Sequence, residues 1–306
     1  MQKPRLRKPR FIRSDGIPPL HLTERDVGIL RLVERHRFVH SGHLCSALAG
    51  SVQHITRRLG RLFHAGFLDR PKAQLLIQPR ANAHMVCCIT NAGQAILRER
   101  GFPTFASPPR ARGETVALSL SHTLRVTDVM LAFERTAAAC GARFLHREDW
   151  QKDSEEGQHL TLMRWSITIQ YDAKRVRCAV IPDAVFALDQ EGKRSYFFVE
   201  ADRGTMPVSR GSADQTSFRR KVLAYKATRD AGILWKRHAI PGFRVLVIAE
   251  SERRLRSLRS AAAACFQRGD STMLCFTLAS NFLSGQEAWQ TCGERSAFQL
   301  FTHPRS

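Results

Sequence analysis

The chain has no apolar run approaching the roughly 18 residues that a membrane-spanning helix needs, so we expect no insertion into a membrane. Its first thirteen residues are strongly basic but contain no apolar core segment, which is not the pattern of a secretory signal. No cysteine belongs to a Cys-x-x-Cys pair, and no histidine pair has zinc-finger spacing. The eight cysteines are therefore expected to be small hydrophobic core residues in a reducing cytosol, rather than zinc ligands or disulfides.

Acidic residues are scarce, because 27 Asp and Glu stand against 48 Lys and Arg and leave a formal net charge of +21 in 306 residues. The hydrophobic content of 43% is too high for a disordered chain and predicts one or two folded cores. So large a charge on a folded chain indicates a polyanionic partner, and nucleic acid is the first expectation. An anionic membrane surface is a distant alternative, because the sequence contains no basic amphipathic anchor helix.

Two segments of unusual composition divide the chain. Residues 1–20 form a basic arm that is expected to be flexible and to lie along phosphates. Residues 102–114 are rich in proline and have the composition of a linker. The predicted domains are therefore residues 21–101 and residues 115–306, both of ordinary size.

The first predicted domain has the pattern of three successive helices. Thr23 and Asp26 have the spacing of an N-cap with an acidic partner, and apolar residues recur at helical spacing after them. After a turn, a short helix is expected at residues 44–48, and Ser51 can cap a third helix. The buried stripe of that third helix is predicted to be Val52, Ile55, Leu59, Leu62 and Phe63.

A β-hairpin is expected after the third helix. Two short apolar runs at residues 75–77 and 85–89 predict its strands, with Arg80 at the tip, and a helix at 92–100 closes the domain. Three helices followed by a hairpin form a winged helix-turn-helix domain. In such a domain the third helix enters the major groove, and we expect the wing to touch phosphate or the minor groove.

The predicted DNA-binding residues lie on the polar face of the third helix and at the wing tip: Gln53, His54, Arg57, Arg58, Arg61 and Arg80. The helical face has no acid to pair with its arginines and follows a tight turn in a strongly basic chain. Arginine can read guanine and glutamine can read adenine in the major groove. The alternatives are that this is a solvated helix face, or that the domain docks on another protein.

The second predicted domain mixes helices with apolar strands, which predicts an α/β core, and acidic residues interrupt its most apolar runs. Asp183 lies within the run over residues 178–188, and Glu200 and Asp202 end the run that begins at residue 195. The two runs predict a β-hairpin in which Glu200 and Asp202 point to one face. If Asp183 lies on the adjacent strand, three carboxylates meet at one place.

Three neighbouring carboxylates raise one another's pKa, and a divalent cation relieves that cost. Oxygen ligands suit Mg²⁺ or Mn²⁺, which can hold a phosphodiester and stabilise the leaving oxygen. Asp183, Glu200 and Asp202 are therefore the predicted metal ligands and catalytic acids. The alternative is that Asp183 is a turn residue and that Glu200 and Asp202 mark a strand end paired with Arg203.

A helix expected from about residue 215 to 229 follows, with Lys221 and Tyr225 on one face at i and i+4. Lys221 is predicted to reach the acids as a catalytic charge stabiliser, since a lysine point charge suits a phosphate. A solvated surface lysine is the alternative. Tyr225 is expected to be a packing residue rather than a nucleophile.

Several segments occur in a familiar order: Leu22-Thr-Glu-Arg-Asp26, the winged-helix region, Leu120-Ser-His122, Pro182-Asp183-Ala184, Phe198-Val-Glu200-Ala-Asp202-Arg-Gly-Thr205, and the helix with Lys221 and Tyr225. The chain resembles the replication-relaxation family of bacterial plasmids and integrative elements. The resemblance implies a winged helix followed by a restriction-endonuclease-like PD-(D/E)xK domain, similar to certain mobilization relaxases.

The resemblance also carries roles onto individual residues. Asp183 matches the first acid of the nuclease pattern and Glu200 the second. The lysine expected two residues later is Asp202 here. Either Asp202 is a third metal ligand and Lys221 supplies the positive charge from the helix, or the site does not cut.

The sequence therefore predicts a cytoplasmic bacterial protein of a mobile genetic element, which binds double-stranded DNA at a plasmid or element origin. It would act in replication, relaxation or mobilization by Mg²⁺- or Mn²⁺-dependent nicking, with other replication or transfer proteins as further partners. One alternative is a non-catalytic replication initiator or transcriptional regulator with a degenerate nuclease domain. Another is a host restriction or repair nuclease with the same core.

Overall fold

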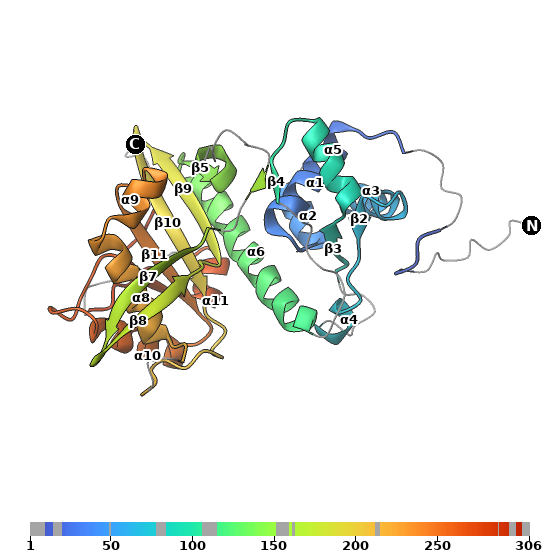
Figure 1. Cartoon of the computed structure of the whole chain (residues 1–306). Coiled ribbons are helices and arrows are strands. Elements are labelled where there is room, and N and C mark those ends of the chain that lie inside the picture. The colour runs from blue at the N-terminus through green and yellow to red at the C-terminus, as the bar shows by residue number, and fades with distance from the viewer. Residues whose placement is uncertain are drawn as a thin grey trace, which may run out of the picture. The chain divides into compact units, whose positions relative to one another are not determined.

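The computed structural model in Figure 1 describes residues 10–14, 20–48, 50–77, 84–105, 115–150, 159–160, 163–211, 215–286, 288–293 and 298–301. Its contacts define two compact units, Met1–Thr127 with Asp153–Thr161, and Asp128–Lys152 with Leu162–Ser306. The division falls inside helix α6 (Thr115–Ala139), which follows the expected linker at 102–114. The reason is that one continuous helix contributes residues to both units. Residues 106–114 of the expected linker lie outside the described residues.

The first unit contains the three expected helices, α1 (Glu24–His36), α2 (Ser41–Ala47) and α3 (Val52–His64), and a later helix α5 (Asn91–Glu99). The predicted caps are confirmed. The side chain of Thr23 accepts from the backbone of Asp26, whose carboxylate accepts from the Thr23 backbone N–H at 2.8 Å, and Ser51 caps α3.

Most of the predicted stripe of α3 lies in the core of the first unit. Ile55, Leu59, Leu62 and Phe63 are at most 2% exposed. Val52 was predicted to belong to this stripe, but its side chain is 60% exposed. Val52 is the first residue of α3. It lies on the same side of the helix as Ile55, but at the end of the helix, where its side chain stays exposed.

A small antiparallel sheet completes the first unit, with β1 (Val39–His40), β3 (Val86–Ile89) and β2 (Leu68–Asp69) in that spatial order. The predicted hairpin is therefore wrong in its first strand, because β3 pairs with β2 and residues 75–77 belong to the short helix α4 (Gln74–Ile77). The buried side chain of Gln74 accepts a hydrogen bond from the N–H of Val86 and donates one to its carbonyl oxygen. These two bonds attach α4 to β3 in place of the pairing that a strand would make. Arg80 lies outside the described residues.

The second unit is built on a five-stranded mixed sheet in the order β12 (Leu274–Leu278), β11 (Phe243–Ala249), β10 (Lys193–Ala201), β9 (Ala184–Gln190) and β5 (Arg143–His146). Strands β10, β11 and β12 are parallel, whereas β9 and β5 join antiparallel. Strands β11 and β12 are mostly apolar, as expected where both faces of a sheet are covered.

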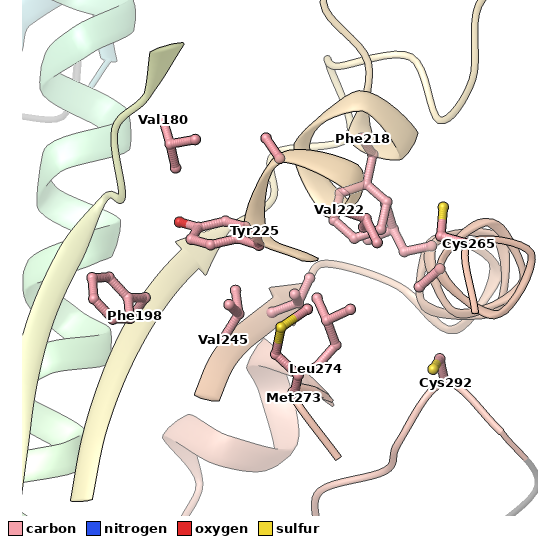
Figure 2. Packing of buried hydrophobic residues seen from close by; sticks show 14 of the residues in the cluster. Val180, Phe198, Phe218, Val222, Tyr225, Val245, Cys265, Met273, Leu274 and Cys292 are labelled. Atoms are coloured by element: carbon pink, nitrogen blue, oxygen red, sulfur yellow. The ribbon is translucent and has the colours of Figure 1, made fainter. Parts of the chain in front are cut away.

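Both faces of this sheet are covered. On one face, α8 (Phe218–Asp230), α10 (Glu252–Ala263) and the hairpin of β7 (Trp165–Tyr171) and β8 (Lys174–Val180) share one apolar cluster with the sheet. Figure 2 shows Phe218, Val222 and Tyr225 of α8 directed toward Val245 and Leu274 of the sheet. On the other face, the ring of Phe133 from α6 lies 4.7 Å from Phe186 of β9 and 4.4 Å from Phe282 of α11 (Ala279–Leu283).

The remaining elements are short: β4 (Thr104–Phe105), β6 (His159–Leu160), α7 (Arg147–Trp150) and α9 (Ile233–His238). The apolar run expected over residues 178–188 is two strands, β8 and β9, because Pro182 and Asp183 separate them. The chain is thus a mixed α/β protein. No disulfide joins any of the eight cysteines, all of which the structure describes, and all but Cys45 are buried, as expected of core residues. None of the described helices has both the length and the apolarity needed to cross a bilayer.

Candidate active site

The hairpin of β9 and β10 places Asp183 beside Glu200. Asp183 immediately precedes β9, and its N–H donates to the carbonyl oxygen of Val199 at 3.0 Å. Its Oδ2 accepts from the N–H of Ala201 at 2.9 Å. Because Glu200 stands between Val199 and Ala201 on β10, these two bonds bring the two acids onto neighbouring segments. The predicted β9–β10 hairpin is confirmed.

Glu200 points toward helix α8 and is only 5% exposed. Its Oε1 accepts from the hydroxyl of Tyr225 at 2.6 Å, and its Oε2 accepts from the Nζ of Lys221. Lys221 and Tyr225 lie four residues apart on α8 and therefore reach the same carboxylate. In Figure 2 the Tyr225 ring lies among apolar side chains, as the prediction of a packing residue requires.

The electrostatics of this group follow from its burial. Burial raises the pKa of Glu200 to about 7; the Lys221 charge lowers this pKa and the neighbouring Asp183 carboxylate raises it. Burial alone would lower the pKa of Lys221, but attraction to Glu200 and Asp183 raises it overall. Burial and the Glu200 charge hold the pKa of Tyr225 well above its usual value. Tyr225 is thus a hydrogen-bond donor, while Lys221 remains a cation at neutral pH.

Asp202 does not join the other two acids. It follows the last residue of β10, and both of its oxygens accept from Arg254 of α10 at 2.8 Å. Its Oδ2 also accepts from the N–H of Gly204 at 2.9 Å. The alternating pleat that would aim it with Glu200 ends at Ala201. Among the described residues, the ligand atoms of Asp183, Glu200 and Asp202 do not form one compact group, and the predicted metal-binding roles of these acids stay predictions.

Asp183 and Glu200 are the residues of this group that fit a divalent cation. Both offer carboxylate oxygens, the ligands that Mg²⁺ and Mn²⁺ prefer. Glu200 is a buried acid whose ionisation is opposed by burial and by Asp183, and a cation at this point would favour the ionised form. Lys221 of α8 places a positive charge beside Glu200, within the reach expected from the sequence, and its catalytic role stays a prediction.

The face of α3 divides into exposed residues and one buried arginine. Gln53, His54, Arg57 and Arg61 are exposed, as a groove-contacting face requires. Arg58 was also predicted to contact DNA, but it is 7% exposed, and its Nε donates to Oδ1 of Asp26 at 2.6 Å. Asp26 is fully buried, so this prediction is wrong, and Arg58 instead ties α3 to the N-terminus of α1.

The basic arm is in part ordered against the same unit. Arg13 donates to the carbonyl oxygens of Phe63 at 3.0 Å and Leu68 at 2.9 Å, and its guanidinium lies over the Phe63 ring. Arg13 thus attaches this part of the arm to the first unit, and the other described residue of the arm is Leu20. The pairing of Arg254 with Asp202 was not predicted, because the two residues lie 52 positions apart and leave no local signal in the sequence.

The profile of the replication-relaxation family matches residues 30–242, more than two thirds of the chain. A comparison with curated proteins finds no match. A solved structure of the restriction endonuclease FokI is similar at 11% identity and a TM-score of 0.27, over 86% of this chain and 42% of the FokI chain. This chain thus spans less than half of the FokI chain, and a likeness at that TM-score carries no argument. Because this match covers more than half of the chain and includes Asp183, Glu200 and Lys221, the chain belongs to the replication-relaxation family.

Proposed function

We propose that this protein binds double-stranded DNA of a plasmid or integrative element and nicks it in a metal-dependent reaction during replication, relaxation or mobilization. The observation that carries the proposal is the group of Asp183, buried Glu200 and Lys221 in a chain of net charge +21. Membership of the replication-relaxation family supports a role in DNA processing. The cytoplasm of a bacterium is the compartment that such a role implies.

The first unit would act as a winged helix-turn-helix. Support comes from three helices, α1 to α3, and from an antiparallel sheet in the order β1, β3, β2. Arg57 and Arg61 lie one turn apart on the exposed face of α3, with Gln53 one turn earlier. In winged helix-turn-helix domains the recognition helix, here α3, enters the major groove. Its arginine and glutamine side chains can there reach base edges and phosphates.

The second unit would supply the nicking site on a PD-(D/E)xK-like core. Asp183 and Glu200 would hold one Mg²⁺ or Mn²⁺ ion. The chemistry that such an ion would supply is binding of the scissile phosphate and stabilisation of developing negative charge. Lys221 is placed to neutralise charge beside these acids, and Tyr225 holds the Glu200 carboxylate in position through its hydroxyl. Helix α8 would thus provide the lysine that the nuclease pattern expects on the strand.

Nicking of supercoiled plasmid with and without Mg²⁺ or Mn²⁺ tests this proposal. Wild type should convert supercoiled DNA to open circles only with the metal, and Glu200→Gln should lose at least 100-fold in rate, about 2.7 kcal/mol of barrier. Glu191→Gln is the matched control, because it is the same substitution at the exposed turn of the same hairpin. Equal nicking by wild type and Glu200→Gln would refute the assignment of Glu200.

A second candidate function is a non-catalytic initiator or regulator with a degenerate nuclease domain. One observation favours it: both oxygens of Glu200 already accept hydrogen bonds, and Asp202 is held by Arg254. This candidate predicts duplex binding without metal-dependent nicking, including on DNA that carries the element's own origin. The plasmid assay therefore separates the two functions.

DNA binding by α3 has its own test. Arg57→Ala with Arg61→Ala should reduce the slope of log K against log salt by about 1.8, because each phosphate contact contributes about 0.9. Lys236→Ala with Arg237→Ala removes two exposed cations from α9 and serves as the control. Unchanged binding and an unchanged slope in the α3 variant would sink the winged-helix assignment.

A further inference from the structure

The β7–β8 hairpin has one face in the core and one face in solvent. The inward residues Trp165, Ile169, Tyr171, Cys178 and Val180 are all at most 4% exposed. The outward residues are all exposed and pair across the two strands as Ser166 with Ala179, Thr168 with Arg177, and Gln170 with Arg175. We call these six residues the outer face of the hairpin.

The orientation of the outer face is fixed by the packing beneath it. Figure 1 shows β7 and β8 beside α8, and the indole N–H of Trp165 donates to the hydroxyl of Thr228 on α8 at 2.7 Å. Arg220 of α8 donates to the carbonyl oxygen of Arg177 at 3.1 Å. Because side chains alternate along a strand, burying one set of residues holds the other set outward.

The outer face carries positive charge without acidic side chains. It contains Arg175 and Arg177, and exposed Arg164 and Lys174 lie near the ends of the hairpin. In the described part of the chain, none of these four cations forms an ion pair. The one acid at the hairpin turn, Asp172, is itself paired with Arg219 at 2.8 Å.

The composition of the outer face distinguishes a nucleic acid from an acidic protein. Arginine, serine, threonine and glutamine are side chains that bind phosphate oxygens in protein–DNA complexes. Protein interfaces usually centre on a large apolar or aromatic anchor, and the outer face has none. Residues two apart on a strand advance by about 6.6 Å, so Arg175 and Arg177 can contact different phosphates.

The hairpin also leads directly to the proposed nicking site. Strand β8 ends at Val180, three residues before Asp183. Arg220, which bonds to β8, is the immediate neighbour of Lys221 on α8. Trp165, the partner of Val180 at this end of the hairpin, has its ring 6.1 Å from that of Tyr225, which donates to Glu200, so this end of the hairpin lies near the acids.

We propose that the outer face of the β7–β8 hairpin binds the phosphate backbone of double-stranded DNA next to the nicking site. This inference rests on the proposed function, because it assigns the surface that would deliver the same DNA to the acids. The protein would then contact DNA through the outer face in addition to α3. Because phosphate contacts carry no sequence information, binding by the second unit would be independent of base sequence.

The test is fluorescence anisotropy of the full-length protein with a labelled 30-base-pair duplex in EDTA, over a series of salt concentrations. Arg175→Ala with Arg177→Ala should weaken binding by about 30-fold at 0.15 M salt and reduce the salt slope by about 1.8. Ser166→Lys adds a cation to the same face and should tighten binding by about 5-fold, with a slope steeper by about 0.9. Lys236→Ala with Arg237→Ala again serves as the charge-matched control.

The outcomes separate this inference from the nicking proposal. Wild-type affinity and slope in both hairpin variants would overturn it and leave an acidic protein as the partner of this face. Absence of duplex binding by wild type would also overturn it. Weakened binding by Arg175→Ala with Arg177→Ala, together with normal nicking by Glu200→Gln, would support the outer face as a DNA-binding surface. The same result would refute the proposed nicking site alone. The gain in affinity with Ser166→Lys cannot arise from misfolding.

Discussion

Glu200 makes the stability of the second unit depend on pH in a direction opposite to that of an ordinary salt-bridged acid. Its carboxyl is buried, and burial raises its pKa from 4.5 to about 7. A folded state that holds this proton more tightly than the unfolded state is favoured at low pH. The replacement Glu200→Gln removes the titration while retaining an oxygen that can accept from Tyr225.

The magnitude follows from the size of the shift. One pKa unit corresponds to 1.36 kcal/mol, so a rise from 4.5 to about 7 corresponds to about 3 kcal/mol. The stabilising contribution of the protonated group is fully present below pH 4.5 and is lost as the pH rises through 7. The stability of wild type relative to Glu200→Gln should therefore fall by about 3 kcal/mol between pH 4.5 and pH 7.5.

Tryptophan fluorescence during urea unfolding is a suitable assay. The four tryptophans, Trp150, Trp165, Trp235 and Trp289, all belong to the second unit, so the signal reports its unfolding alone. Titrations of wild type and Glu200→Gln in EDTA at half-unit steps of pH give the difference in unfolding free energy. Titrating groups that do not interact with Glu200 act in both proteins and cancel in this difference.

The control is Glu191→Gln, whose exposed carboxyl should leave the difference from wild type nearly constant over the same range. A constant difference between wild type and Glu200→Gln, or one that changes in the opposite direction, would refute the conclusion that burial dominates this site. Added Mg²⁺ should shift the wild-type transition toward greater stability at pH 7.5 and should act weakly on Glu200→Gln.

Three further predictions concern packing and ion pairs. Arg58→Ala should lower the free energy of unfolding by about 3–5 kcal/mol, because it leaves the buried Asp26 carboxylate without its cation. A loss under 1 kcal/mol in unfolding followed by circular dichroism would contradict this. Asp202→Ala and Arg254→Ala should each lower the unfolding free energy of the second unit, and the double variant should lose clearly less than the sum of the two losses. Additive losses in melts followed by tryptophan fluorescence would argue against coupling of the two residues. Gly93→Ala should cost about 1–3 kcal/mol, because its Cβ would lie 2.3 Å from the Phe67 carbonyl oxygen, and an unchanged melting temperature would show that this contact relaxes freely.

Local patterns in the sequence predicted the elements that local physics decides. The caps at Thr23 and Ser51 satisfy backbone donors within three residues, so the cap and its partner are visible together. The turn between β9 and β10 joins strands that are adjacent in sequence, so their pairing is predictable from the sequence. Strand β11 is predictable from the apolar composition of its own residues. The first strand of the expected wing failed because the buried bonds of Gln74 to Val86, twelve residues away, stabilise α4 instead.

The sequence by itself determined the basic character of the chain, the cap-and-periodicity signals of its helices, and the β9–β10 hairpin that brings Asp183 beside Glu200. Only the tertiary structure decided which charged residues pair in the interior. Arg58 and Arg57 are adjacent in sequence, yet Arg58 is buried against Asp26 and Arg57 is exposed. Asp202 is two residues from Glu200, yet it pairs with Arg254 on α10. A buried charge must find a partner, and partners 32 and 52 residues away become neighbours only once the chain has folded.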